Sequence, residues 1–80
     1  MQASEANEFL NDLTIRERKI LTLVVEGLTN QEIAEELISA EGTVKKHREH
    51  IYRKANVKGA KAIRKFINEI RPYLTSDSTH

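Results

Sequence analysis

GLTNQEIAEELISAEGTVKKHREHIYRKA, residues 27–55, is the stretch that decides the fold. Thr29 and Glu32 have the Thr-x-x-Glu spacing of a capping box, in which each side chain bonds the backbone N–H of the other residue at a helix start. Ile33 and Ala34 follow as the start of an apolar stripe at helical spacing. We therefore predict a short helix of about two turns.

A longer helix is predicted over residues 42–55, after a turn at about residues 38–42. Val44 and Ile51 share one face of this helix, and polar side chains occupy the opposite face. Asn56 follows, and asparagine accepts the left-handed conformation that ends many helices. The stretch is thus predicted to form two helices joined by a tight turn, the second polar and basic on its outer side.

The flanking segments each add one helix. Thr14 and Glu17 repeat the capping box, which predicts a helix over residues 15–26. The last helix is predicted over about residues 60–71, because Pro72 pushes the residue before it out of the helical region. No segment reads as a strand. The expected fold is all-α, a compact four-helix helix-turn-helix domain with a short extra turn in front.

The chain is expected to hold one domain, because 80 residues allow one modest core. Residues 1–12 are assigned to an N-terminal extension or linker, although Phe9 and Leu10 could anchor the short leading turn. The domain itself spans residues 13–74, and residues 75–80 are expected to form a disordered tail.

Composition argues against several classes of protein. There is no cysteine, and three scattered histidines make no metal cluster, so neither a disulfide framework nor a metal site is expected. No nucleophile–base pair or glycine-rich phosphate loop is present, so we expect no enzyme, cofactor or small-molecule ligand. Apolar runs stay far below the ~20 residues of a membrane span and no secretory signal is visible, which favours a cytoplasmic protein.

Charge is segregated along the chain although its net value is only +1. Residues 1–40 carry three basic and eight acidic side chains, whereas residues 41–65 carry nine basic and two acidic ones. Residues 66–80 carry one basic and two acidic side chains. A solvated helix face usually interleaves both signs, so this segregation favours a polyanionic partner, for which double-stranded DNA is the natural choice.

The outward face of the helix at residues 42–55 suits base recognition. The major groove is roughly 12 Å wide and admits one helix, and this face offers donors for guanine and an acceptor for cytosine N4. The residues predicted to read bases are Lys45, Lys46, Glu49, His50 and Arg53. The residues predicted to contact phosphates, which lie near helix starts or flanks, are Thr29, Asn30, Thr43, His47 and Lys54.

Four segments in consistent order resemble the LuxR/FixJ-type, GerE-like C-terminal DNA-binding domain of bacterial transcription regulators. They are LTIRERKIL (13–21), GLTNQEIA (27–34), GTVKKH (42–47) and IYRK (51–54). The resemblance implies that the third helix enters the major groove, that the fourth supports dimerisation and that Glu17 is a structural acid near the core. It also places on or beside DNA the positions of Thr43, Val44, Lys45, Lys46 and Glu49.

The turn before the third helix departs from this family pattern. Members usually have an aliphatic residue and then a serine there, whereas this chain has Ser39 and Ala40, with Ile38 one place early. The missing serine removes a helix cap, which typically costs ~1 kcal/mol. We predict a locally shifted turn in which Ile38 fills the core and either Ser39 or Glu41 caps the helix.

The last helix carries an apolar band broader than a small core usually needs. We predict that Ile63, Ile67 and Ile70 mostly face the core, while Ala62 and Phe66 lean towards a second copy. The interface of a homodimer is assigned to Ala62, Ile63 and Phe66, although core packing alone would also explain the band. A two-fold dimer would bind half-sites about one helical turn apart.

These observations together predict a sequence-specific DNA-binding output domain of a transcription regulator of the response-regulator or quorum-sensing type. It is expected to act at the bacterial nucleoid and to meet RNA polymerase there. Two alternatives stay open. Sigma factor region four resembles the same pattern and binds promoter DNA together with polymerase. A protein-interaction or dimerisation module could keep this fold without binding DNA.

Overall fold

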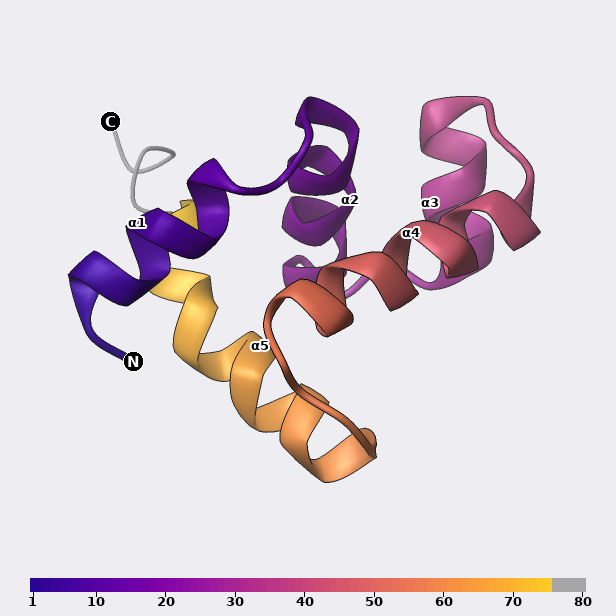
Figure 1. The fold of residues 1–80 in the computed structure, drawn as a ribbon. Helices are drawn as coiled ribbons and strands as arrows, with labels where there is room; N and C mark the ends of the chain where they lie inside the picture. Colours follow the sequence, from indigo (N-terminus) through magenta and orange to yellow (C-terminus); the bar gives the residue numbers. More distant parts are fainter. Residues whose placement is uncertain (76–80) are drawn as a thin grey trace.

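The computed structural model describes residues 1–75 and shows five helices and no strand in that range (Figure 1). The helices are α1 (Ala3–Asn11), α2 (Ile15–Val25), α3 (Asn30–Leu37), α4 (Glu41–Lys54) and α5 (Ala60–Thr75). The prediction of an all-α domain is confirmed, but the number of helices is five rather than four. None of the described helices is long and apolar enough to cross a membrane.

Helix α4 lies between the pair α2 and α3 on one side and α5 on the other. It packs against both α2 and α3, while α5 packs against α1 and α2 (Figure 1). The largest fully buried side chains come from four helices and are Ile20, Leu21, Ile33, Val44, Ile51 and Ile70. Because all contacts hold α4 from its apolar side, its polar side is left to solvent.

Helix α1 is the element that the sequence reasoning missed. Residues 1–12 were assigned to an extension or linker with at most a short turn, yet α1 begins at Ala3 and buries Ala6 and Leu10 completely or nearly so. Phe9 meets Phe66 of α5 edge to face, with ring centroids 5.3 Å apart. Ala6, Phe9 and Leu10 thus pack an otherwise polar segment against the rest of the domain.

The starts and ends of the helices are fixed by recurring local hydrogen-bond motifs. Both predicted capping boxes are confirmed, at Thr14 with Glu17 and at Thr29 with Glu32. Helices α2, α3 and α4 each end in a Schellman motif, in which an N–H bonds the carbonyl five residues earlier. These bonds join Leu28 to Leu23, Ser39 to Ala34 and Val57 to Tyr52, at 3.1, 2.9 and 3.0 Å.

Each of these ends needs one residue with positive φ. Gly27 (φ 95°) and Asn56 (φ 58°) accept this conformation readily, and Asn56 ends α4 as predicted. Ile38 occupies the same place after α3 with φ 52°, although a β-branched side chain is strained there.

The prediction of a shifted turn that buries Ile38 is wrong. Its side chain is 94% exposed, and Ala40 stands at the start of α4 without any side-chain cap, so neither Ser39 nor Glu41 caps the helix. Shifting the turn by one residue would break the backbone bonds that end α3. The Schellman motif therefore fixes which residue turns outward, and apolar character does not override it.

Helix α5 also differs from its predicted end. It continues through Pro72 to Thr75, although proline cannot donate to the carbonyl of Asn68. Tyr73 and Leu74 beyond the proline pack against the core, and the Tyr73 hydroxyl donates to the carbonyl of Met1 at 3.2 Å. This packing offsets the lost bond. Apart from Thr75, the predicted tail lies outside the described residues.

Candidate nucleic-acid interface

Helix α4 has one buried and one solvent-facing side. Val44 and Ile51 are fully or almost fully buried against the supporting helices. The residues predicted to read bases lie on or beside the solvent side: Lys45, Lys46, Glu49 and Arg53 are exposed and His50 is half-buried. The resemblance also placed Val44 beside DNA, and that position is wrong for this chain because no part of Val44 reaches the surface.

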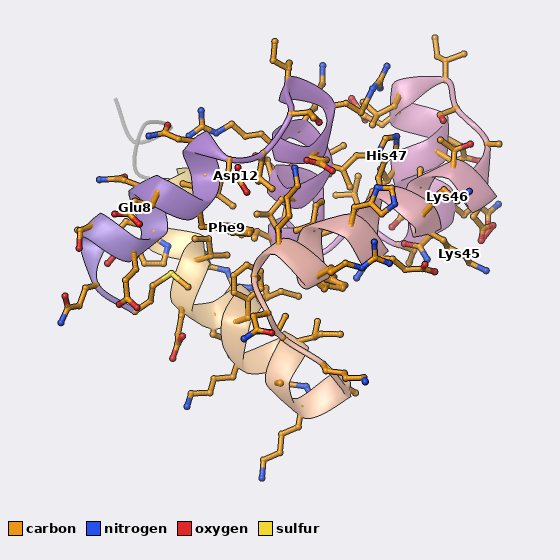
Figure 2. The ribbon with its side chains drawn as sticks, in the orientation of Figure 1. Glu8, Phe9, Asp12, Lys45, Lys46 and His47 are labelled. Atoms are coloured by element: carbon orange, nitrogen blue, oxygen red, sulfur yellow. The ribbon has the colours of Figure 1, made fainter. Side chains whose placement is uncertain are left out.

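The cations on the outer side of α4 form no ion pair with any residue of the range 1–75. Within residues 1–75 the salt bridges join the N-terminal ammonium to Glu69 and Lys54 to Glu17, and neither involves the outer side of α4. Figure 2 shows Lys45 and Lys46 near the start of α4, on the other side of the molecule from Glu8 of α1. Glu8 thus lies far from the start of α4, whereas Glu32, Glu35 and Glu36 are exposed on α3, which packs against α4.

The start of α3 is held in place by its own capping box. The Thr29 hydroxyl accepts from the N–H of Glu32 at 3.1 Å, and the Glu32 carboxylate accepts from the N–H of Thr29 at 2.8 Å. Asn30, the first residue of α3, is half-buried. Helix starts of this kind carry partial positive charge, which suits the phosphate-contact role predicted for Thr29 and Asn30.

Arg48 ties the start of α3 to α4, a role that the sequence reasoning did not find. One of its terminal nitrogens donates to the Asn30 side-chain oxygen at 2.7 Å. Its other nitrogens, Nε and the second terminal one, donate to the Tyr52 hydroxyl at 3.1 and 2.9 Å. The Tyr52 ring in turn meets Phe66 of α5 edge to face, with centroids 6.5 Å apart. The sequence contained one signal for this contact: Arg48 and Tyr52 are four residues apart, and side chains at this spacing are neighbours on a helix.

Lys54 is engaged inside the fold. Its ammonium donates to the Glu17 carboxylate at 2.9 Å and to the Asp12 carbonyl at 2.9 Å. The phosphate-contact role predicted for Lys54 is therefore wrong in this structure, because both partners belong to the protein itself. The pair joins the end of α4 to the start of α2.

Glu17 is a buried acid, as the resemblance implies, with only 4% of its surface exposed. Its carboxylate also accepts from the N–H of Thr14 at 2.9 Å. Burial alone would raise the pKa of Glu17, but the hydrogen bond and charge of Lys54 and the bonds to Thr14 outweigh it and hold the pKa below its ordinary value.

The other predicted phosphate contacts lie around α4. Thr43 is exposed on its first turn. His47 is half-buried, and its Nδ1 is buried without a hydrogen-bond partner within residues 1–75. The second ring nitrogen is thus the atom through which His47 could reach a phosphate.

The apolar band of α5 faces the core in a different register from the predicted one. Phe66 is only 3% exposed and is covered by Phe9 and Tyr52, so its assignment to a dimer interface is wrong. Ile70, one turn later, is fully buried as predicted, whereas Ile63 and Ile67 are half-buried. The large ring of Phe66 fills the space between α1 and α4, which turns the isoleucines towards the edge.

A groove connects the outer side of α4 with the start of α5. Glu49 and Arg53 line it from α4, and Lys58 and Ile63 line it from the loop and from α5. Ala62 beside it is half-buried. The remaining candidates for a dimer interface thus adjoin the candidate DNA-reading side.

Residues 11–65 match the family described as bacterial regulatory proteins, luxR family, and the chain belongs to this family. The match covers α2, α3 and α4 and the first six residues of α5. The helix-turn-helix formed by α3 and α4 is thus that of a DNA-binding transcription regulator. The match identifies the chain as a LuxR-type domain, so the alternative of sigma factor region four is not supported.

Known regulators share this segment. The nitrate/nitrite response regulator protein NarL of Escherichia coli K12 is 47% identical over 49 residues, which are 61% of this chain and 23% of NarL. The oxygen regulatory protein NreC of Staphylococcus carnosus is 41% identical over 56 residues, 70% of this chain and 26% of NreC. The spore germination protein GerE of Bacillus subtilis is 45% identical over 47 residues, 59% of this chain and 64% of GerE.

The match to NarL and NreC spans about a quarter of their length. No solved structure gives a significant match to this chain.

Proposed function

We propose that this chain reads duplex DNA in a sequence-specific manner through the outer side of α4, as the output domain of a regulator. The observation that carries the proposal is the asymmetry of α4. One side is buried against α2 and α3, while Lys45, Lys46 and Arg53 on or beside the other side have no ion-pair partner within residues 1–75. A helix that is packed on its apolar side and carries hydrogen-bond donors on its solvent side is suited to the major groove.

Base reading is assigned to Lys45, Lys46, Glu49, His50 and Arg53. Lysine and arginine donate to guanine O6 and N7, whereas a glutamate accepts from cytosine N4, so Glu49 is the residue that would select against guanine at its position. Phosphate contacts are assigned to Thr29, Asn30, Thr43 and His47, around the starts of α3 and α4.

A two-fold dimer through Ala62 and Ile63 would match two half-sites on the duplex. Both residues are half-buried, so they retain surface that a second copy could cover. The domain would act in the cytoplasm at the nucleoid, where a sensor or receiver domain of the same regulator supplies the signal. Contact with RNA polymerase would couple DNA binding to transcription.

The proposal is tested by selecting bound duplexes from a random pool at two salt concentrations and sequencing them. An enriched, roughly two-fold symmetric motif that weakens with salt is expected. Lys46→Ala and Glu49→Ala should change which bases are preferred, whereas Thr43→Val should weaken binding to all sequences alike. The matched control is Lys19→Ala, which removes a cation from the exposed side of α2.

Two outcomes would contradict the proposal. No enrichment at either salt concentration would favour a protein-interaction module with the same fold. An equal loss on every sequence for Lys46→Ala, Glu49→Ala and Thr43→Val would refute the division between base-reading and phosphate-contacting residues.

A further inference from the structure

The solvent side of α5 carries a second group of cations, which the predicted DNA contacts do not include. Lys61, Arg64 and Lys65 are exposed, on the side of α5 opposite Phe66 and Ile70. We call these three residues the α5 basic stripe. Lys58 in the preceding loop is exposed as well.

Few acids lie near the stripe: Glu69, four residues after Lys65 on α5, forms its salt bridge within residues 1–75 with the N-terminal ammonium. From residue 50 to residue 68 the sequence contains no aspartate or glutamate. None of the three cations forms a salt bridge with any residue of the range 1–75. Lys61 lies three residues before Arg64 and four before Lys65, and like charges at these spacings destabilise a helix. The stripe is thus a repulsive arrangement that a polyanion would relieve.

The first turns of α5, which carry the stripe, adjoin the DNA-reading side of α4. Lys58 and Ile63 line the same groove as Glu49 and Arg53, so the first turns of α5 begin beside the outer side of α4. A duplex whose major groove receives α4 has its sugar–phosphate backbone on the flanks of this helix.

We infer that the α5 basic stripe is a second contact surface for the phosphates of duplex DNA, beyond the groove that α4 reads. This inference rests on the proposed function and extends its footprint along the backbone. A dimer through Ala62 would also bring the stripes of both copies near each other, because Lys65 lies three residues from Ala62 on the same helix. Phosphates between the copies would neutralise that repulsion.

The test compares two triple variants that change the net charge equally. Lys61→Gln, Arg64→Gln and Lys65→Gln together remove the stripe. The control variant combines Arg16→Gln, Arg18→Gln and Lys19→Gln, which removes three exposed cations from α2. Binding to a short duplex of random sequence is measured by fluorescence anisotropy over a range of salt concentrations, so that no operator is needed. Circular dichroism and thermal melting verify that both variants are folded.

The slope of log K against log salt should become shallower by about 2 to 3 for the stripe variant, since each lost phosphate contact accounts for about 0.9. It should remain unchanged for the α2 variant. Equal changes in both variants would overturn the inference, because net charge alone would then explain the binding. An unchanged slope in the stripe variant would overturn it too, and so would a change confined to self-association in sedimentation experiments, which would mark the stripe as a protein interface.

Failure of the proposed function gives a different result. If the unmodified chain shows no salt-dependent binding to duplex DNA, the proposed function itself fails. If it binds and Lys46→Ala changes base preference while the stripe variant binds normally, only the α5 surface is refuted.

Discussion

Replacing Lys54 with methionine should destabilise the fold far more than an ordinary surface change. Methionine keeps much of the aliphatic stem but removes the ammonium that bonds the Glu17 carboxylate and the Asp12 carbonyl. Glu17 would remain 4% exposed with its charge uncompensated. A buried carboxylate without its cation is costly because neither water nor protein then replaces the lost attraction.

The magnitude follows from the geometry. At 2.9 Å the attraction between the two charges is about 6 kcal/mol at an effective dielectric constant of ~20. Desolvation of both groups offsets much of this attraction, and removal of one partner of a buried pair costs about 3–5 kcal/mol. Because the Lys54 side chain is 32% exposed, water screens part of the interaction, and we expect a loss of about 2–3 kcal/mol. The melting temperature should fall by roughly 10–20 °C.

The loss should also depend on pH. In the unmodified chain the pKa of Glu17 is lowered, so the pair stabilises the fold above the unfolded carboxyl pKa of about 4.3, and this stabilisation is lost as pH falls through the folded pKa. In Lys54→Met only the bonds to Thr14 still oppose the effect of burial, so the pKa of Glu17 should rise relative to its value in the unmodified chain. The deficit of the variant should therefore be greatest near neutral pH and shrink as Glu17 becomes protonated.

Urea denaturation followed by circular dichroism measures the free energy of unfolding for a double-mutant cycle with Glu17→Gln. Glutamine can keep the capping bond to Thr14, so the cycle isolates the charge interaction. Lys19→Met on the exposed side of α2 is the matched control and should stay within about 0.5 kcal/mol of the unmodified chain. If Lys54→Met behaves like Lys19→Met, or if the deficit does not change with pH, the structural role of the pair is refuted.

Three further changes address the turn and the α3–α4 connection. Ala40→Ser should raise the free energy of unfolding by about 1 kcal/mol, because α4 lacks a side-chain cap; a loss in urea denaturation would contradict this. Ile38→Asn should add about 1 kcal/mol by relieving the strain of positive φ at an exposed position, and a cost would show instead that Ile38 has a packing role. Tyr52→Phe removes the hydroxyl to which Arg48 donates, so DNA binding should weaken several-fold. The free energy of unfolding should fall by no more than about 1 kcal/mol. Unchanged affinity for DNA would argue against Arg48 as a positioning residue.

Features set by neighbouring residues were predictable. The capping boxes at Thr14 and Thr29 depend on two side chains three residues apart, and both form as expected. Asn56 ends α4 because its own backbone preference matches the left-handed position. In such cases the local preference and the tertiary structure agree, so the sequence alone is sufficient.

Other features depend on contacts between distant segments. Helix α1 has nine residues, too few to be stable alone in water, and it exists because Ala6, Phe9 and Leu10 meet the rest of the domain. Ile38 takes the left-handed position although its own preference opposes it, since the length of α3 and the start of α4 fix the turn. The continuation of α5 beyond Pro72 depends in the same way on the packing of Tyr73. Local preferences predict the wrong outcome in each case because packing outweighs them.

The basic segment shows most clearly what a sequence pattern leaves undecided. Consecutive residues on a helix point about 100° apart, so Arg53 faces solvent while Lys54 reaches back to Glu17. Of the nine cations in residues 41–65, Arg48 and Lys54 have partners inside the protein. The charge count alone would allow a salt slope of about 8 for DNA binding, whereas the seven remaining cations allow at most about 6. The salt dependence of DNA binding is therefore set by which lysine and arginine side chains are left without a partner inside the protein. That follows from the tertiary contacts of α4 and not from its composition.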